Sequence, residues 1–218
     1  MSMFKLEDSH WHKGLRKKMV ETLRRKGISD ERVLAAMEVV PRHFFLDSAL
    51  AHLAYEDQAL PIECEQTISQ PYTVAFQTQL LQVEKRQRIL EVGTGSGYQA
   101  AILGALGARV FTVERHKALH QHSKELLAAM KLRNVRCYWG DGYKGLPEFA
   151  PFDRIIVTAA AAEVPQSLLE QLKPGGFLVI PVGDPVQKML RVTREADGSF
   201  TEERFGSFRF VPFLKGKA

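Results

Sequence analysis

The sequence predicts an α/β protein with a Rossmann-like, doubly wound and mostly parallel sheet that carries helices on both faces. Short runs rich in aliphatic and β-branched residues occur at 88–92, 109–113, 135–139, 153–158 and 176–182. Helical stretches lie between most of these runs, at 97–106, 116–131 and 164–172. Strands that alternate with helices are typical of parallel sheets joined by right-handed crossovers. A glycine-rich turn follows the first run, at the sheet edge where such folds bind ligands.

The composition favours one domain, residues 1–218, with a sizeable core, since 45% of the residues are hydrophobic and 25% are charged. The net charge is +5, but the 30 basic residues are interleaved with 25 acidic ones, so we expect no nucleic-acid partner. Cys64 and Cys137 lack the spacing of a disulfide framework or a metal site. No apolar run approaches the roughly 18 residues of a membrane span, and no signal peptide is evident. We therefore expect a cytoplasmic protein without a membrane partner.

Residues 1–60 are predicted to form a helical N-terminal extension. Apolar residues recur at helical spacing within 11–26, and Gly27 ends that helix. Ser29 is placed to cap a second helix, which ends before Pro41.

Residues 61–85 are predicted to form a loop and a helix beside the ligand site. The loop contains the run IECEQTISQPYTVAF at 62–76. Within it, Ser69 is placed to cap a helix that Pro71 opens, because proline suits the first helical position.

The ligand-binding core is expected at 86–183, followed by C-terminal strands at 184–218. In this tail, MLRVTRE and FTEERFGSFRFVPF are separated by Asp197-Gly198. A turn of this kind between strand-like runs predicts antiparallel strands at the edge of the sheet. The alternating aromatic residues of the last run are more typical of a core than of a substrate groove; they are Phe205, Phe208, Phe210 and Phe213.

The turn after the first predicted strand belongs to the run LEVGTGSGYQ, in which Gly93, Gly95 and Gly97 alternate with other residues. Glycines allow a tight turn and a close approach of a ligand to a helix N-terminus. The dinucleotide fingerprint would require a third glycine at position 98, where Tyr98 stands. The turn therefore indicates a nucleotide-like ligand without matching that fingerprint.

Three acidic residues occur at the ends of successive predicted strands. Glu91 lies within the end of the first strand, Glu114 ends the second, and Asp141 follows the third. A carboxylate in the position of Glu114 can accept hydrogen bonds from both hydroxyls of a ribose. The position of Asp141 suits acceptance of a hydrogen bond from an adenine amino group. Together with the glycines, these acids predict a nucleoside ligand.

These motifs resemble those of class I S-adenosylmethionine-dependent methyltransferases, with LEVGTGSG as the first motif and LKPGG (172–176) as the turn before the fifth strand. More specifically, QTISQPYTVA (66–75), VTAAAAEVPQSLLEQLKPGG (157–176) and RFVPF (209–213) resemble the protein-L-isoaspartate O-methyltransferase family. With these segments included, the resemblance covers almost the whole chain.

The resemblance implies methyl transfer from S-adenosyl-L-methionine to the free α-carboxylate of L-isoaspartyl residues in damaged proteins and peptides. The resulting ester would collapse to a succinimide, whose hydrolysis returns part of the population to aspartate. The implied product of the cofactor is S-adenosyl-L-homocysteine, and no metal is implied. We expect a monomer whose partners are isoaspartyl-containing proteins and peptides.

The resemblance also implies the site. Ser69 is the expected catalytic residue, orienting the acceptor carboxylate. The expected cofactor-binding residues are Thr67, Ser69, Gln70, Glu91, Gly93, Gly95, Ser96, Gly97, Glu114, Asp141 and Gly142. Ile62 and Val211 are the expected substrate-binding residues.

Other chemistries are less favoured. Ser69 as a nucleophile would need a base and an elbow such as GxSxG, and its surroundings offer neither. Thr158 and two alanines stand where many N-methyltransferases of nucleobases have an Asn-Pro-Pro-Tyr or Asp-Pro-Pro-Tyr segment. A carboxylate acceptor is ionised at neutral pH and needs no general base. His116 and His120 lie four apart but lack the acid of an HExxH motif.

One departure from the family concerns Glu63-Cys64-Glu65, which replaces a small, glycine-rich segment before QTIS. Two carboxylates would oppose an anionic substrate unless they point outward or accept hydrogen bonds from the peptide's N–H groups. Two alternatives therefore stay open. One is a methyltransferase with a different carboxyl, hydroxyl or RNA acceptor, and the other is a non-catalytic S-adenosylmethionine-binding module.

Overall fold

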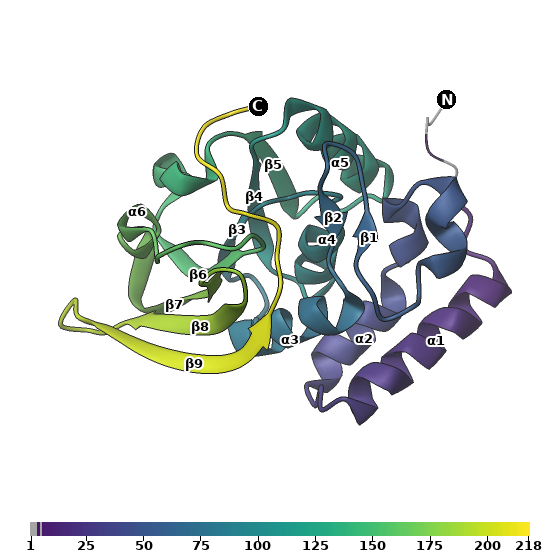
Figure 1. Cartoon of the computed structure of the whole chain (residues 1–218), viewed down its shortest axis with the longest axis horizontal. Coiled ribbons are helices and arrows are strands. Elements are labelled where there is room, and N and C mark those ends of the chain that lie inside the picture. The colour runs from purple at the N-terminus through teal and green to yellow at the C-terminus, as the bar shows by residue number, and fades with distance from the viewer. Residues whose placement is uncertain (1–3, 5) are drawn as a thin grey trace.

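The computed structural model describes residues 4 and 6–218 and contains a seven-stranded sheet in the order β5-β4-β3-β6-β7-β8-β9 (Figure 1). The strands are β3 (Arg88–Val92), β4 (Arg109–Glu114), β5 (Val135–Trp139), β6 (Phe152–Val157), β7 (Leu172–Val182), β8 (Gln187–Arg194) and β9 (Phe200–Phe208). The pairs from β5 to β7 are parallel, and β8 and β9 add antiparallel strands at one edge. The predicted α/β fold with a mostly parallel sheet is confirmed.

The order of the strands reverses at β3, which pairs with β4 on one side and with β6 on the other. The helices that connect or flank the strands are α3 (Pro71–Leu81), α4 (Tyr98–Ala105), α5 (Lys117–Ala129) and α6 (Gln166–Leu169). Buried side chains from α3, α4 and α5 share a core with one face of the sheet. The short α6 and the segment around Leu146 cover the opposite face.

Strand β7 begins four residues earlier than the sequence predicts, and helix α6 is correspondingly short. Leu172 is fully buried and pairs with Phe152, so the LKPGG segment already belongs to the sheet. The register shifts between Phe152 and Arg154, and Gly175 takes a positive φ of 74° nearby. This irregularity lets a proline and two glycines enter the strand, which a propensity argument does not anticipate.

The N-terminal extension forms helices α1 (His10–Arg25) and α2 (Glu31–Val39), which pack beside α3 (Figure 1). The expectation that Ser29 caps the second helix was wrong. Asp30 is the N-cap and accepts a hydrogen bond from the Arg32 N–H, because its carboxylate also suits the positive end of the helix dipole. The backbone N–H of Ser29 instead donates to Gln79 of α3 at 2.8 Å.

Two short 3₁₀ helices, η1 (Arg42–Phe45) and η2 (Ser48–Leu53), lead from α2 to a small hairpin. The hairpin strands are β1 (Leu60–Pro61) and β2 (Thr67–Ile68), which the sequence did not predict. Pro71 opens α3 as predicted, but its N-cap is Gln70 and no side chain caps the helix. Ser69 is therefore not a helix cap, and its hydroxyl makes no hydrogen bond to the part of the chain that the structure describes.

The C-terminal strands β8 and β9 meet at the predicted Asp197-Gly198 turn, where the Asp197 carboxylate accepts a hydrogen bond from the Ser199 N–H. β9 ends at Phe208, and the RFVPF segment leaves the sheet to lie beside Ala160. There Ala160 donates to the carbonyl of Val211 and accepts from the N–H of Phe213, at 2.8 and 2.7 Å. Among the residues with described placement, no helix is long and apolar enough to span a membrane.

The N-terminal extension is packed into the core, which two residues of α2 can test. Leu34 is 1% exposed and Val39 is 69% exposed. We expect Leu34→Ala to lower the free energy of unfolding by about 2–5 kcal/mol, because it leaves a cavity. Val39→Ala should change it by less than about 0.5 kcal/mol. Urea denaturation followed by circular dichroism measures both values, and equally small effects would show that α2 is not part of the cooperative unit.

Candidate active site

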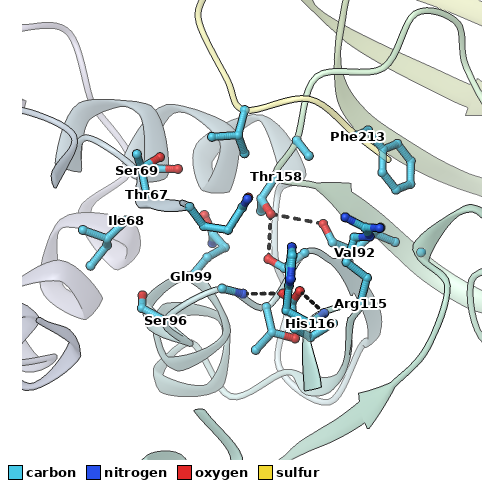
Figure 2. Close-up of a pocket in the computed structure, with 18 of the residues that line it drawn as sticks. Thr67, Ile68, Ser69, Val92, Ser96, Gln99, Arg115, His116, Thr158 and Phe213 are labelled. Atoms are coloured by element: carbon cyan, nitrogen blue, oxygen red, sulfur yellow. Dashed lines mark hydrogen bonds between the residues drawn. The ribbon is translucent and has the colours of Figure 1, made fainter. Parts of the chain in front are cut away.

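A cavity opens at the carboxyl ends of β3, β4 and β6 and encloses about 820 Å³, part of it open to solvent (Figure 2). We call it the glycine-turn cavity. Of the predicted site residues, it is lined by Thr67, Ser69, Gly93, Gly95, Ser96, Glu114, Gly142 and Val211. The predicted residues that do not line it are Ile62, Gln70, Glu91, Gly97 and Asp141. The two ends of the chain segment 67–211 thus contribute to one site.

The glycine turn has a backbone that a side chain would disturb. Gly93 has a φ of 96°, and a Cβ built on it would lie 2.4 Å from the hydroxyl oxygen of Thr158. That hydroxyl bridges the carbonyl oxygens of Val92 and Gly93, at 3.1 and 2.7 Å (Figure 2). Glycine is therefore required at position 93 both by its backbone conformation and by the contact between the ends of β3 and β6.

Glu114 lies at the end of β4 with its carboxylate in the cavity wall. One oxygen accepts a hydrogen bond from the N–H of Gly95 at 2.8 Å, and the other accepts from the N–H of His116 at 2.9 Å (Figure 2). Each carboxylate oxygen can accept more than one hydrogen bond. The backbone thus fixes the orientation of Glu114 and leaves acceptor capacity for the hydroxyls of a ribose.

Glu91 is fully buried beneath the cavity, and neither carboxylate oxygen has a hydrogen-bond partner of normal geometry among the described residues. Burial raises the pKa of Glu91 to about 8, the nearby Thr112 hydroxyl acts in the opposite direction, and the Glu114 carboxylate raises the pKa further. Glu91 is therefore largely protonated at neutral pH. It lies within strand β3, behind the cavity wall.

Two other predicted residues shape the wall from behind. Asp141 accepts a hydrogen bond from the N–H of Tyr143 and caps a short 3₁₀ helix, which places Gly142 in the cavity wall. Gly97 is the N-cap of α4, where a Cβ would lie 3.3 Å from atoms of both Ser123 and Leu127. Close packing of α5 therefore explains the third glycine of the turn.

The Ser69 segment is held by a buried arginine that sequence reasoning missed. Arg42 has no exposed surface, and its guanidinium donates to the carbonyl oxygens of Ala54, Gln58 and Ser69. Burial lowers its pKa to about 10, so the group is still a cation at neutral pH. Its planar array of donors connects η2 and the following loop to the backbone of Ser69.

A second hollow, the tail groove, borders the glycine-turn cavity and encloses about 1230 Å³, again partly open to solvent. Its walls come from the start of α3 and from the tail after β9, and include Gln70, Tyr72, Arg209 and Phe210. The two hollows share four lining residues, which we call the junction residues: Thr67, Ser69, Thr158 and Val211. A ligand in one hollow and a ligand in the other would meet at Ser69.

Several further cavity residues were not predicted as site residues. They are Thr94, Gln99, Arg115, His116, Thr158, Ala159, Phe213 and Leu214. Arg115 and His116 could have been predicted from the sequence, because residues that directly follow a strand lie at the edge of the sheet where ligands bind. Phe213 stacks on Tyr143 with ring centroids 4.0 Å apart, so it lines the cavity and packs on the core at once. Its position depends on the return of the tail to Ala160, which no local pattern indicates.

His116 and His120, at the start of α5, do not belong to a group of close metal ligands among the described residues. In the described part of the chain, the only group of potential ligands that come close together is Asp8, His12 and His43. These groups are engaged elsewhere, since Asp8 pairs with Arg16 at 2.9 Å and the His43 ring is hydrogen-bonded to the Tyr55 hydroxyl at 2.6 Å. This cluster stabilises the packing of the N-terminal extension.

The sheet order, the glycine turn at the switch point and the acid at the end of β4 define a class I S-adenosylmethionine-dependent methyltransferase. A model of the family described as protein-L-isoaspartate(D-aspartate) O-methyltransferase matches residues 14–218. The chain belongs to this family.

Similar proteins support this assignment over the full length. A protein-L-isoaspartate O-methyltransferase of Christiangramia forsetii is 52% identical over 212 residues, which are 97% of this chain and 100% of that protein. One of Cytophaga hutchinsonii is 54% identical over 210 residues, which are 96% and 95% of the two chains.

Solved structures of the same kind match the fold. A structure of a protein-L-isoaspartate O-methyltransferase has a TM-score of 0.83 and 31% identity, and the match covers 90% of this chain and 65% of that chain. A Plasmodium falciparum structure of this kind, in complex with S-adenosyl-L-homocysteine, has a TM-score of 0.81 and 28% identity, covering 92% and 99% of the chains.

The residues of the glycine-turn cavity fit S-adenosylmethionine. Gly93 and Gly95 leave the turn without side chains on the cavity side, and Glu114 is positioned for a ribose. The backbone of the turn and the orientation of Glu114 thus suit a nucleoside cofactor.

The raised pKa of Glu91 predicts that stability depends on pH. The folded protein keeps this proton up to a pKa of about 8, whereas an unfolded chain releases it near a pKa of about 4.3. The stability is thus complete below the unfolded pKa and falls as the pH rises toward 8, by at most about 1.4 kcal/mol per pH unit. Glu91→Gln keeps the shape of the side chain, but the amide does not titrate. The variant should therefore become more stable relative to the wild type as the pH rises from about 5 to 8.

Urea denaturation of both proteins at several pH values, without cofactor, measures this difference in the free energy of unfolding. A difference between wild type and Glu91→Gln that stays constant from pH 5 to 8 would contradict a buried, titrating Glu91.

Proposed function

We propose that the protein transfers the methyl group of S-adenosyl-L-methionine to the free α-carboxylate of L-isoaspartyl residues in damaged proteins and peptides. The observation that carries this proposal is that the glycine-turn cavity and the tail groove meet at Ser69, whose hydroxyl has no hydrogen-bond partner among the described residues. When bound, the cofactor supplies an electrophilic methyl group. The protein then has to align an acceptor with it and exclude water.

The residues at the junction suit a carboxylate acceptor. An α-carboxylate is ionised at neutral pH, so it attacks without a general base, and the junction residues offer none. The hydroxyl of Ser69 is free to donate a hydrogen bond to one carboxylate oxygen and thereby orient the other. Arg42 supports this role by holding the Ser69 carbonyl at 3.1 Å.

The remaining predicted residues take supporting positions in this proposal. Thr67 lines both hollows beside Ser69, and Gln70 lines the tail groove while its amide donates to the Asp57 carbonyl at 3.0 Å. Val211 lines both hollows and offers backbone contacts to a peptide. Ile62 lies against the glycine turn, with its Cδ1 3.8 Å from a Cβ built on Gly95.

The charges around the tail groove favour an anionic substrate. Arg209 is the one charged side chain that lines this groove within the described residues, and it is exposed. Glu63, Cys64 and Glu65 form the exposed turn of the β1–β2 hairpin, with positive φ at Cys64 and Glu65. Solvent therefore screens both carboxylates, which reduces their repulsion of a substrate carboxylate.

We further propose a cytoplasmic monomer that acts on isoaspartyl-containing proteins and peptides and has no nucleic-acid or membrane partner. Two arginines of α1 are paired with acidic residues of the same chain, which lowers the positive charge that this helix offers to a nucleic acid. Arg16 is buried against Asp8, and Arg24 pairs with Glu31 across the α1–α2 turn. These arginines are already neutralised within the protein.

The direct test uses methyl-labelled S-adenosylmethionine with matched peptides that contain L-isoaspartate, L-aspartate or D-aspartate. Base-labile methyl ester is then counted. We expect label largely on the isoaspartyl peptide. Binding of S-adenosyl-L-homocysteine without labelling of any peptide would contradict the proposed acceptor.

Replacement of the junction serine separates catalysis from cofactor binding. We expect Ser69→Ala to lower kcat by roughly 10- to 100-fold, because one hydrogen bond to a charged acceptor is lost. The Kd for S-adenosyl-L-homocysteine should change by less than about twofold. Ser199→Ala, in the exposed β8–β9 turn, is the matched control and should retain full turnover. Equal losses in kcat and cofactor affinity for Ser69→Ala would assign the serine to the cofactor instead.

A further inference from the structure

The tail after β9 crosses from Ala160, which follows β6, to Lys117, which begins α5. Figure 1 shows this crossing as the yellow end of the chain. The tail is firmly held up to Phe213, whose carbonyl oxygen accepts a hydrogen bond from the Tyr143 hydroxyl at 3.3 Å and whose ring stacks on that tyrosine. Residues 214–218 then run on to α5, and we call them the strap.

The far end of the strap is bound by the first residues after β4. The side chain of Arg115 donates from Nε to the carbonyl oxygen of Gly216 at 3.2 Å and from a terminal nitrogen to that of Lys215 at 3.4 Å. The Arg115 carbonyl oxygen accepts from the N–H of Ala218 at 2.9 Å, and the N–H of Lys117 donates to the Ala218 carbonyl oxygen at 2.9 Å. We call these four hydrogen bonds the latch.

The strap borders the end of the glycine-turn cavity where the adenosine part of the cofactor is expected. Leu214 of the strap and Arg115 of the latch both line this cavity, beside Gly142 on the expected adenine side. Figure 2 shows Arg115 and Phe213 across the cavity from Ser69. The strap therefore lies away from the junction with the tail groove, where the methyl acceptor is expected.

The contacts that hold the strap are of a kind that breaks at low cost. Leu214 is 49% exposed, and Lys215, Lys217 and Ala218 are exposed as well, so opening uncovers little additional apolar surface. The two side-chain bonds of Arg115 are at or beyond the long end of the usual range for N–H···O bonds. Segments with few buried apolar contacts open locally while the rest of a protein stays folded.

The latch is also next to the acid that is expected to bind the ribose. Glu114 directly precedes Arg115, and its carboxylate accepts a hydrogen bond from the N–H of His116 at 2.9 Å. A ribose bound to Glu114 would order the segment 114–117, which carries the latch. Bound cofactor therefore favours the closed strap, and a closed strap helps to exclude water from the site.

We infer that residues 214–218 open and close the adenosine end of the glycine-turn cavity, with Arg115 as the residue that latches them. The inference deepens the proposed function and rests on its cofactor, but not on its methyl acceptor. The open strap admits S-adenosylmethionine and releases S-adenosyl-L-homocysteine, and the closed strap retains the cofactor during methyl transfer. Opening therefore limits both the entry and the exit of the cofactor.

The inference predicts how the latch sets the rates of cofactor exchange, which stopped-flow binding of S-adenosyl-L-homocysteine measures without any peptide. Arg115→Ala removes the two side-chain bonds, and deletion of residues 215–218 removes all four bonds of the latch. We expect koff to rise about 10-fold in Arg115→Ala, and at least as much in the deletion variant. We expect kon to rise at least about threefold in both, because the open form becomes more populated.

Two control variants separate the latch from a general effect of charge. Arg115→Lys keeps the cation but replaces the planar array of donors, so its two rates should lie between those of the wild type and Arg115→Ala. Arg133→Ala removes another exposed arginine, in the loop before β5, and should leave both rates unchanged. Thermal unfolding reports the folding of each variant, and Arg115→Ala carries the test even where the deletion variant does not fold.

Trp139 offers a direct signal for closure, because the ammonium group of Lys217 lies 4.4 Å from the centre of its ring. The chain has two tryptophans, so Trp11→Phe leaves Trp139 as the single one. In this background, S-adenosyl-L-homocysteine should reduce the quenching of Trp139 fluorescence by acrylamide. The same ligand should leave the quenching unchanged when residues 215–218 are deleted.

A raised koff with an unchanged kon in both latch variants would overturn the inference, because the tail would then be a fixed part of the cavity wall. Wild-type values of both rates in both variants would overturn it as well. These outcomes are independent of the peptide-labelling test, since a protein that methylates another acceptor would still exchange its cofactor faster without the latch.

Discussion

The end of strand β3 is the point on which the rest of the site depends. β3 pairs with β4 on one side and β6 on the other, so the segments that follow β3 and β6 diverge and leave a crevice. The hydroxyl of Thr158 bridges the carbonyl oxygens of Val92 and Gly93 across this point. That contact leaves no room for a Cβ at Gly93. One hydrogen-bonded contact thus aligns two strand ends and keeps the turn accessible to a cofactor.

The N-terminal extension contributes to the same site through a buried cation. A guanidinium without exposed surface is costly unless its protons find acceptors. The two terminal nitrogens of Arg42 find them in the backbone carbonyls of Ala54, Gln58 and Ser69, whereas its Nε has no partner among the described residues. The position of Ser69 is therefore coupled to the packing of the first 60 residues, so the extension is a structural part of the site.

The parts of the molecule that depend on local pattern could be predicted from the sequence. Strand and helix periodicity indicated the parallel sheet, and the run that contains Gly93 located the cavity. What could not be predicted depends on long-range contacts. The early start of β7 follows from the pairing of Leu172 with Phe152, and the place of Phe213 follows from the bonds between the tail and Ala160. Arg42 carries no local signal, because its partners are backbone carbonyls.

The distribution of charge within the site is consistent with a reaction in which no side chain has to act as an acid, a base or a nucleophile. Transfer of a methyl group from a sulfonium to a carboxylate removes two opposite charges, so a dry environment favours the transition state over the separated, hydrated reactants. The junction residues, among them Ser69 and Thr158, are all uncharged. Glu114, the acid that lines the cavity, is not one of the junction residues and is held by the N–H groups of Gly95 and His116. A fixed carboxylate at the junction would compete with the substrate carboxylate for the sulfonium and stabilise the ground state. Neutral donors and acceptors can orient both reactants without this competition, which is consistent with the role that we propose for the Ser69 hydroxyl.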